Sequence, residues 1–405
     1  MCIFRLSQVR YFLSSMRIDL IFPVLPPTLD GIGDHTAHLA AALADQHHDV
    51  RILTAQSQAA PIPGVQVVDA FDAKPRRAIR SLADAVAIEA PDWLVLQYNP
   101  FSYGRWGLNL SLPATLRDIR RRCPNTRIAL LMHEPFVPIE NWRFALYTTW
   151  QRWQLWQLGR TADVVFVSIA PWVDRFQSWF SNTPVHHLPV GSNIPHVAAD
   201  RNAARHDLDL PSDAFVVGLF GSGHPSHLLS FTRHAIDRLR DTGLYPEVVY
   251  IGAAGDKIAS VLGSDNLHCT GPLPGPDVSR AFAAMDLYLS PFRQGVSTRR
   301  GSFLVGLQHG IATVSTTGEQ TDPLLRDQHE SAVLLAPDDA PDRFASQVVA
   351  LAQDQASRSR IARTGRTLFD TTFAWPRIAD AMLEVLSKYP RSSSLPEPAA
   401  ASPSA

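Results

Sequence analysis

Two segments of this chain share one local pattern, an apolar run followed by a glycine-containing turn. The first run spans Arg17 to Phe22 and precedes the turn Asp30 to Asp34, and the second spans Ala214 to Phe220 and precedes Gly221 to His224. Each pattern predicts a buried strand that enters a turn and then a helix. Because such a turn presents backbone N–H groups and the positive end of a helix, it suits anions such as diphosphates. Two such halves predict a cleft between two domains.

Apolar runs rich in β-branched residues alternate with helical patterns along the rest of the chain. Strands separated by helices form parallel sheets with right-handed crossovers. The predicted fold class is therefore α/β, with two Rossmann-like doubly wound parallel-sheet domains facing each other across a cleft. We predict strands at Arg17–Phe22, Val50–Thr54, Val65–Asp69, Trp93–Gln97, Arg127–Met132, Val164–Val167, Phe215–Phe220, Glu247–Ile251, Leu267–Thr270, Asp286–Ser290, Ile311–Ser315 and Val333–Leu335.

Length and local composition predict the domain boundaries. At 405 residues the chain exceeds one ordinary domain. We expect a first domain over residues 16–195, a polar linker near 191–211 and a second domain over 210–374. Residues 1–15 look like a non-structural extension, with Met16 as the expected natural start, and the Ser-, Pro- and Ala-rich residues 391–405 are expected to be a disordered tail.

Composition excludes several classes of protein. The formal net charge is −1, so no overall basic field favours nucleic acid as a partner. No apolar stretch approaches the length of a membrane-spanning helix. Cys2, Cys123 and Cys269 match no metal-ligand spacing, which favours a reducing compartment and predicts no metal site. Any anion site must therefore be built locally.

Ligands of open parallel sheets bind beyond the carboxyl ends of the strands. The loop Phe292–Gly301 follows a predicted strand, precedes a helix predicted over Ser302–His309, and carries three arginines and two hydroxyls. An arginine fork pairs with two phosphate oxygens at once, so the loop is a candidate pyrophosphate cradle. The alternative is an exposed basic turn that caps the helix.

The chain resembles retaining family-4 glycosyltransferases of the GT-B fold over about residues 16–388. The resemblance rests on Pro-Pro-x-x-Asp-Gly-Ile-Gly-Asp at 26–34, Ala162-Asp163 before a strand and Ser168, the Pro291-Phe292 loop, and His-Gly-Ile-Ala-Thr at 309–313. It implies that residues 16–195 bind the acceptor and residues 210–374 bind a nucleotide sugar. It also implies that a final helix, residues 375–389, crosses back to the first domain.

Position and resemblance together assign candidate site residues. His133 would face the transferred sugar, and with Arg299 and Arg300 it forms the predicted catalytic set; a histidine that is merely hydrogen-bonded at a strand end is the alternative. Glu134, Trp150 and Trp153 are placed on the acceptor side. The predicted donor-binding residues are Gly31, Gly33, Ser222, His227, Gly295, Val296, Ser297, Thr298 and Glu319, with the amides of Gly295, Val296 and Ser297 offered to the phosphates.

The chain departs from the family at two places. Members commonly carry an arginine and a lysine after the first strand of the second domain, where this chain has Ser222 and His227. They also commonly carry two glutamates around the later loop, where the nearest residues are Gln294 and Val305. We expect Arg299 and Arg300 to supply the missing positive charge. Glu319 is a candidate substitute for the glutamate that holds the nucleotide ribose, and an ordinary surface loop is the alternative.

Aromatic residues and arginines are interleaved between Asn141 and Arg160. Leu146, Trp150 and Trp153 would share one helical face, which suits a membrane interface. An amphipathic helix packed on its own domain is the alternative.

The favoured function is a glycosyltransferase (EC 2.4) that moves a sugar from a UDP- or GDP-sugar to a hydroxyl acceptor with retention. The expected setting is polysaccharide or glycolipid assembly in the cytoplasm, with peripheral contact at the inner membrane face left open. The partners are the sugar nucleotide and a glycan or lipid-linked acceptor, with no cofactor and no metal. The alternative is a catalytically degenerate GT-B-like protein that binds a sugar nucleotide as a sensor or partner subunit.

Overall fold

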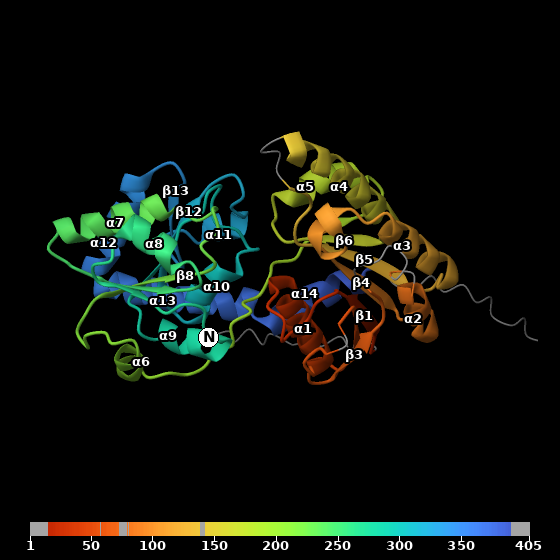
Figure 1. Cartoon of the computed structure of the whole chain (residues 1–405), viewed down its shortest axis with the longest axis horizontal. Helices are drawn as coiled ribbons and strands as arrows, with labels where there is room; N and C mark the ends of the chain where they lie inside the picture. The colour runs from red at the N-terminus through yellow and green to blue at the C-terminus, as the bar shows by residue number, and fades with distance from the viewer. Residues whose placement is uncertain (1–14, 57, 73–78, 80, 138–141, 390–405) are drawn as a thin grey trace, which may run out of the picture.

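The computed structural model describes residues 15–56, 58–72, 79, 81–137 and 142–389. These residues form two α/β domains that lie side by side (Figure 1). The predicted extension, apart from Ser15, and the predicted tail 391–405 lie outside the described residues. Within the described part, no helix is both long and apolar enough to cross a membrane.

The first domain is built on a sheet of seven parallel strands in the order β3-β2-β1-β4-β5-β6-β7. Apolar clusters cover both faces of this sheet, as expected for parallel strands between helices. Its elements are β1 (Arg17–Ile21), α1 (Gly31–Asp45), β2 (Asp49–Thr54), β3 (Val65–Asp69), α2 (Ser81–Glu89), β4 (Trp93–Tyr98), η2 (Pro100–Ser102), η3 (Arg105–Gly107), α3 (Ser111–Arg122), β5 (Arg127–Met132), α4 (Trp142–Thr161), β6 (Val164–Val167), α5 (Trp172–Phe180) and β7 (Val185–His187).

The second domain repeats the arrangement with six parallel strands in the order β10-β9-β8-β11-β12-β13. Its elements are α6 (Arg201–Asp207), β8 (Val216–Phe220), α7 (Leu229–Asp241), β9 (Glu247–Ile251), α8 (Gly255–Leu262), β10 (Leu267–Cys269), α9 (Gly275–Phe282), β11 (Leu287–Ser290), α10 (Gly301–Gln308), β12 (Ala312–Thr317), α11 (Pro323–Asp327), β13 (Leu334–Pro337), α12 (Pro341–Gln353), α13 (Gln355–Leu368), the π-helical turn η4 (Phe369–Phe373) and α14 (Trp375–Ser387).

All twelve predicted strands are present, most within one residue of the predicted ends, whereas two elements escaped the sequence pattern. The short edge strand β7 contains Val185 and two histidines, so it carries little apolar signal. The predicted linker contains helix α6, whose N-cap Asp200 accepts the amide of Ala203. The polar sequence of the linker gave no periodic signal for this helix, which is stabilised by its cap and by the burial of Arg205.

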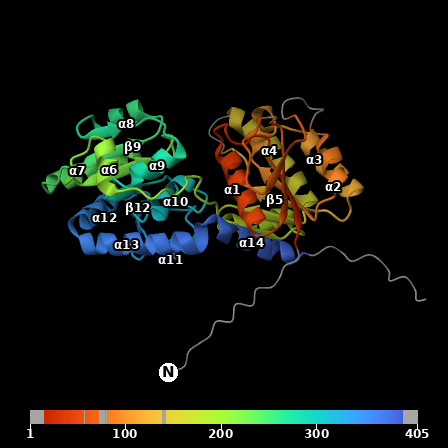
Figure 2. The same ribbon diagram turned by 90° about the horizontal axis from the view of Figure 1, so that it is seen from below.

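The last helix returns to the first domain. α14 packs against α1 (Figure 2) and buries Ile378, Met382 and Leu383 in the cluster that covers one face of the first sheet. At its start, the Trp375 Nε1 donates to the Ser192 carbonyl at 2.9 Å. A Cβ on Gly191 would lie 2.6 Å from the Trp375 ring, so glycine is required at that position. The start of the C-terminal helix is therefore packed against the linker between the two domains.

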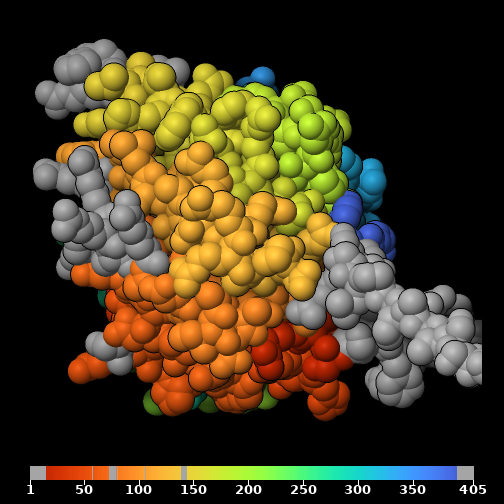
Figure 3. All heavy atoms as spheres, turned by 90° about the vertical axis from the view of Figure 1, so that its right-hand side faces the viewer, coloured from red at the N-terminus to blue at the C-terminus, as the bar shows by residue number. Residues whose placement is uncertain are grey.

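In each sheet, the chain adds strands first toward one edge and then toward the other, and this switch occurs at the corresponding place in both sheets. The order reverses between β1 and β4 in the first sheet and between β8 and β11 in the second. Open α/β sheets bind ligands outside the carboxyl ends of strands at such switch points. Seen from the side, the first domain forms nearly the whole visible face, with α4 along its upper part (Figure 3). The loops at the switch points are therefore the place to look for a site.

Candidate functional site

Three neighbouring cavities lie at the carboxyl ends of the strands of both domains. Their volumes are about 410, 500 and 960 Å³. Asn99, which follows β4, lines all three, while Glu134, Arg299 and Ser302 each line the 410 and 960 Å³ cavities. The 500 Å³ cavity is lined by the first domain alone. Because the three cavities share lining residues, they form one cleft that is bordered by both domains.

Arg300 supplies an uncompensated cation to the largest cavity. Burial, and then the neighbouring charge of Arg299, lower the pKa of the Arg300 guanidinium to about 10, so the group stays protonated at neutral pH. The guanidinium lies 4.8 Å from the centroid of the Phe292 ring. Among the described residues, no hydrogen bond or ion pair is found for this side chain. A partly desolvated cation without an anion at a cavity wall is suited to an anionic ligand.

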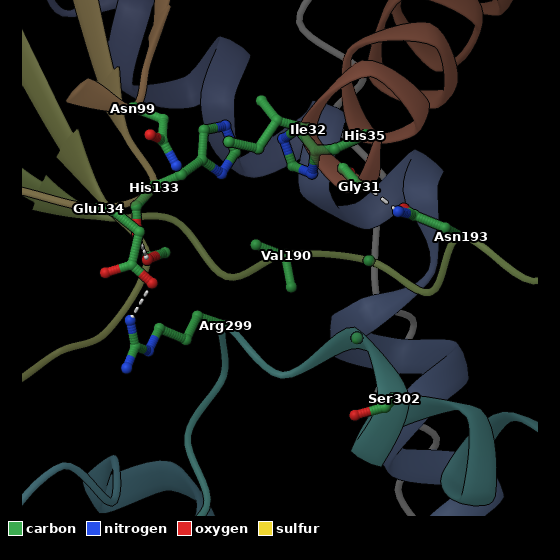
Figure 4. A pocket seen from close by; sticks show the side chains of 13 residues that line it. Gly31, Ile32, His35, Asn99, His133, Glu134, Val190, Asn193, Arg299 and Ser302 are labelled. Atoms are coloured by element: carbon green, nitrogen blue, oxygen red, sulfur yellow. Dashed lines mark hydrogen bonds and ion pairs between the residues drawn. The ribbon is translucent and has the colours of Figure 1, made fainter. Parts of the chain in front are cut away.

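Arg299 reaches across the cleft to the first domain. Its Nη1 pairs with Glu134 Oε1, as the dashed line in Figure 4 marks, and its Nη2 donates to Gln320 Oε1 at 2.9 Å. The guanidinium lies 5.2 Å from the centroid of the Trp172 ring. The ion pair joins a loop of the second domain to the end of β5 in the first.

Helix α10 begins beside these arginines. No side chain caps its N-terminus, and Gly301 and Ser302 line the cleft. A Cβ on Gly301 would lie 3.5 Å from the Gly191 carbonyl oxygen, so the helix start closely approaches the linker. The N–H groups of a first helical turn are a ready anion site. The guanidinium groups and the helix end thus face the same space.

Two of the three amides predicted to bind phosphate, in the loop before Arg299, already have backbone partners. The amide of Gly295 donates to the Phe292 carbonyl and that of Val296 to the Thr316 carbonyl, so both are already occupied. Ser297 and Thr298 are fully buried. A Cβ on Gly295 would lie 2.2 Å from the Gly318 nitrogen, so this glycine permits close packing of two loops. The amides of Gly295 and Val296 are therefore not available to a ligand in this structure.

Two backbone amides of the glycine turn in the first domain also have hydrogen-bond partners within the protein. Asp30 Oδ1 accepts the amides of Ile32 and Gly33, both at 2.9 Å, and so caps α1. A Cβ on Gly33 would lie 2.5 Å from the Val24 carbonyl oxygen, which explains the glycine by packing. Gly31 lines the cleft, and its carbonyl accepts from Asn193 Nδ2 at 2.9 Å (Figure 4). Of the two predicted glycines, Gly31 is the one that borders the cavity.

His133 lies at the end of β5, and its imidazole packs against a second one, that of His35. Its Nε2 donates to Gln97 Oε1 at 2.6 Å, and its ring meets the His35 ring edge to face, 4.8 Å between centroids. Burial lowers the pKa of His133 to about 3 and that of His35 well below its ordinary value. Both rings are therefore neutral at physiological pH, and both line the 410 Å³ cavity (Figure 4).

The remaining predicted donor residues separate into two groups. Ser222 and His227 line the 960 Å³ cavity, where burial and then Arg300 lower the pKa of His227 to about 4. Glu319 is exposed and lines none of the three cavities. The predicted role of Glu319 as a ribose ligand therefore has no support from the cavities, and the sequence pattern did not reveal how exposed its side chain is.

Trp150 and Trp153 of α4 lie outside the cavities. Trp153 is 43% exposed, whereas the indole nitrogen of Trp150 is buried. Among the side chains of this helix that the structure describes, 144–161, the exposed large apolar ones are Leu146, Trp153 and Trp156. The Arg160 guanidinium lies 4.7 Å from the Trp156 ring centroid. The exposed stripe, Leu146, Trp153 and Trp156, therefore differs from the predicted face.

Several cleft residues were missing from the sequence-based set, among them His35, Asn99 and Asn193. Asn99 lies two residues after the end of the predicted strand Trp93–Gln97, so the rule that selected His133 would also have selected it. His35 lies one turn inside α1, and Asn193 lies in the linker, so neither carried such a signal. Within the described ranges, no group of three or more His, Cys, Asp or Glu side chains is arranged to hold a metal ion.

Comparison with known families finds one match, within the second domain. Residues 214–354, from β8 to α12, match the family described as "Glycosyl transferases group 1". This segment contains the basic loop and α10. No curated protein sequence matches the chain significantly.

Several solved structures align with both domains. Sucrose-phosphate synthase from Thermosynechococcus elongatus aligns with a TM-score of 0.69 and 16% identity over 92% of this chain and 98% of its own. HepE from Anabaena, solved with UDP and glucose, aligns at 0.65 and 16% over 92% and 100%. WaaG, a glycosyltransferase involved in lipopolysaccharide biosynthesis, aligns at 0.63 and 13% over 91% and 99%. These alignments show that the chain shares their fold.

Proposed function

We propose a donor, an acceptor side and a reaction course for this chain, which is a glycosyltransferase of group 1 with the GT-B fold and a nucleotide-sugar donor. The resemblance to retaining family-4 enzymes is thereby confirmed. The donor class we propose is a UDP-sugar, since HepE was solved with UDP-glucose in the same fold. A GDP-sugar is the alternative donor.

The observation that carries the proposal is the unpaired Arg300 guanidinium at the start of α10. The diphosphate of the donor is placed against Arg300, Arg299 and the first amides of α10, where two cations and a helix end meet its charge. Ser222 and His227 border the same cavity. His227 is neutral at pH 7, so it does not supply the positive charge that family members commonly have in this loop. In this chain the two arginines supply that charge.

The reaction follows from where charge develops. Breaking the bond between the anomeric carbon and the diphosphate oxygen leaves positive charge on the sugar and negative charge on the phosphate. Fixed cations aimed at the leaving phosphate therefore lower the barrier. With retention, the acceptor hydroxyl attacks on the face that the diphosphate leaves, and its proton passes to the departing phosphate oxygen.

The neutral imidazole of His133 borders the space between the phosphate groups and the first domain. We place the transferred sugar there, with His133 and Glu134 facing its hydroxyls. Glu134 is bound to Arg299 in this structure, so a bound diphosphate competes with Glu134 for the same guanidinium.

The acceptor is assigned to the 500 Å³ cavity of the first domain. Asp30, Asn99 and Ser102 offer polar groups there, and Phe101, half exposed, offers an aromatic face. These groups fit a glycan or the sugar of a glycolipid, as in polysaccharide or glycolipid assembly. The exposed tryptophans of α4 fit peripheral contact with a membrane that carries such an acceptor.

The test is nucleoside diphosphate release from a panel of UDP-, GDP- and ADP-sugars, followed by isothermal titration of the matching diphosphates. We expect slow hydrolysis of one UDP-sugar and micromolar UDP binding. Analysis of the anomeric configuration of the released sugar then tests retention. Tight binding of a sugar nucleotide without release from any donor or glycan acceptor would instead support a sensor. Preference for a GDP-sugar would reassign the base.

A further inference from the structure

Asp322 is a fully buried carboxylate that lies behind the basic loop and outside the three cavities. It is the residue before α11, yet its side chain does not cap that helix. Oδ2 accepts the Thr298 amide at 2.7 Å, and Oδ1 accepts the Ala170 amide at 2.6 Å. Thr298 belongs to the second domain and Ala170 to the first. One carboxylate therefore receives one N–H from each domain.

Thr298 adds further bonds at the same place. Its hydroxyl donates to the Ser168 carbonyl at 2.8 Å, so it accepts from His187 Nε2, also at 2.8 Å. Its own carbonyl accepts the Val190 amide at 3.0 Å. All three partners lie in the first domain or at the start of the linker. The four residues Ser168, His187, Thr298 and Asp322 form what we call the interdomain clasp.

Burial makes the clasp selective for one arrangement of the loop. A carboxylate held away from water loses several kcal/mol of hydration unless donors replace that water. Here the replacing donors are fixed backbone amides, one of which belongs to the residue directly before Arg299. Separating the second domain from the first would remove the Ala170 donor, and shifting the loop within the second domain would remove the Thr298 donor. The position of the arginines is therefore tied to the contact between domains.

We propose that Asp322 is a positioning residue that holds Arg299 and Arg300 against the cleft through the interdomain clasp. The proposal rests on the proposed function, because it takes the arginines as the groups that bind the diphosphate. Asp322 itself touches no substrate. Its effect is transmitted through Thr298 to the two residues that follow.

The test is a double-mutant cycle between Asp322→Asn and Arg300→Ala. The asparagine amide would face one of the two N–H donors and break that bond. We expect Asp322→Asn alone to lower donor turnover about 100-fold, the effect of a misplacement near 1 Å. In the Arg300→Ala background we expect a loss below about threefold, since the group being positioned is gone. Thr298→Val, which removes only the hydroxyl, should follow the same pattern with a smaller loss, and Thr298→Ser should recover part of it.

Asp286→Asn is the matched control. Asp286 is a buried carboxylate of the same domain that accepts the Val216 amide at 2.8 Å and pairs with Arg205, at the strand ends far from the cleft. It should lower the melting temperature while folded enzyme keeps its turnover within about twofold. Equal losses for Asp322→Asn in both backgrounds would overturn the proposal and indicate a general folding defect.

A second readout separates this proposal from the proposed reaction. The UDP dissociation constant is measured for the wild type, the two single variants and the double variant. The fraction of binding-competent protein is determined in the same titrations. If the wild type binds UDP without turning over any donor, the proposed reaction is refuted. The double-mutant cycle measured on UDP binding still tests whether Asp322 positions the arginines. A crystal structure of Asp322→Asn in which Arg299 still pairs with Glu134 and Arg300 is unmoved would also overturn the proposal.

Discussion

Arg300 combines a lowered pKa, a position against Phe292 and a place at the cleft wall without a carboxylate partner among the described residues. A cation in that state stabilises charge on a ligand more strongly than one already paired in water. Lysine is a poor substitute because it lacks the planar fork that meets two phosphate oxygens.

Replacement of Arg300 by alanine is expected to lower donor turnover by roughly 10²- to 10³-fold, the usual cost of removing one donor from a charged transition state. Arg300→Lys should recover only part of this loss. Turnover is measured by diphosphate release, with circular dichroism as the check on folding. Turnover of Arg300→Ala near that of the wild type would remove Arg300 from the mechanism.

The buried imidazoles of His35 and His133 make stability depend on pH. Their pKa values in the folded protein lie far below the 6.5 of an exposed histidine, to about 3 for His133. Below pH 6.5 the unfolded chain therefore binds protons that the folded chain does not. The free energy of unfolding is fully retained above about pH 6.5 and falls as the pH drops toward 3.

His133→Gln should reduce this slope because glutamine does not titrate. Urea unfolding at pH 5, 6 and 8 measures the slope, and His206→Gln, which changes an exposed histidine, is the control with a slope like the wild type. The same pKa values predict no change of activity near pH 6 from His133. Parallel pH profiles of stability for wild type and His133→Gln would contradict a neutral buried imidazole.

At the scale of single elements, α4 exposes three large apolar side chains on one face. Leu146, Trp153 and Trp156 expose 59, 43 and 37% of their surface, and Arg152 and Arg160 lie beside aromatic rings. Tryptophans with neighbouring arginines favour the boundary between lipid headgroups and acyl chains.

The double substitution Trp153→Ser/Trp156→Ser should weaken binding to vesicles of anionic phospholipid by about tenfold, since most of the inserted apolar area is lost. Co-sedimentation measures the bound fraction. Ile88→Ser, which removes an apolar side chain that is 78% exposed on α2, is the control for nonspecific loss. Equal recovery of wild type and double variant in the supernatant would count against membrane contact.

At the scale of the whole molecule, the site exists only where the two domains meet. The pair between Glu134 and Arg299 spans the cleft in the space assigned to the donor. A diphosphate that takes Arg299 must displace this carboxylate. The free energy of the ion pair is therefore subtracted from that of donor binding.

Glu134→Gln should tighten UDP binding by up to about fivefold, which corresponds to about 1 kcal/mol for a partly exposed pair. Calorimetric titration with UDP gives the dissociation constant. Glu89→Gln, which removes a carboxylate paired with Arg17 on the surface of the first domain, should leave the constant unchanged. Weaker UDP binding by Glu134→Gln would mean that Glu134 contacts the nucleotide rather than competing with it.

The sequence by itself determined the two parallel sheets and the loops that form the site. Hydrophobic runs record which strands are buried on both faces, and the rule for carboxyl ends then selects His133, Arg299 and Arg300. These are local properties, written in consecutive residues. Strand β7 and helix α6 escaped because three-residue strands and capped short helices carry little periodicity.

Only the tertiary structure decided which groups of those loops are available to a ligand. The amides of Gly295, Val296 and Gly33 are hydrogen-bonded within their own domains, Glu319 faces away, and Thr298 is buried between domains. His35, Asn193 and Asp322 gain their positions from contacts between residues far apart in the sequence. The physical reason is that burial and hydrogen-bond partners depend on the approach of distant segments, which no local pattern encodes.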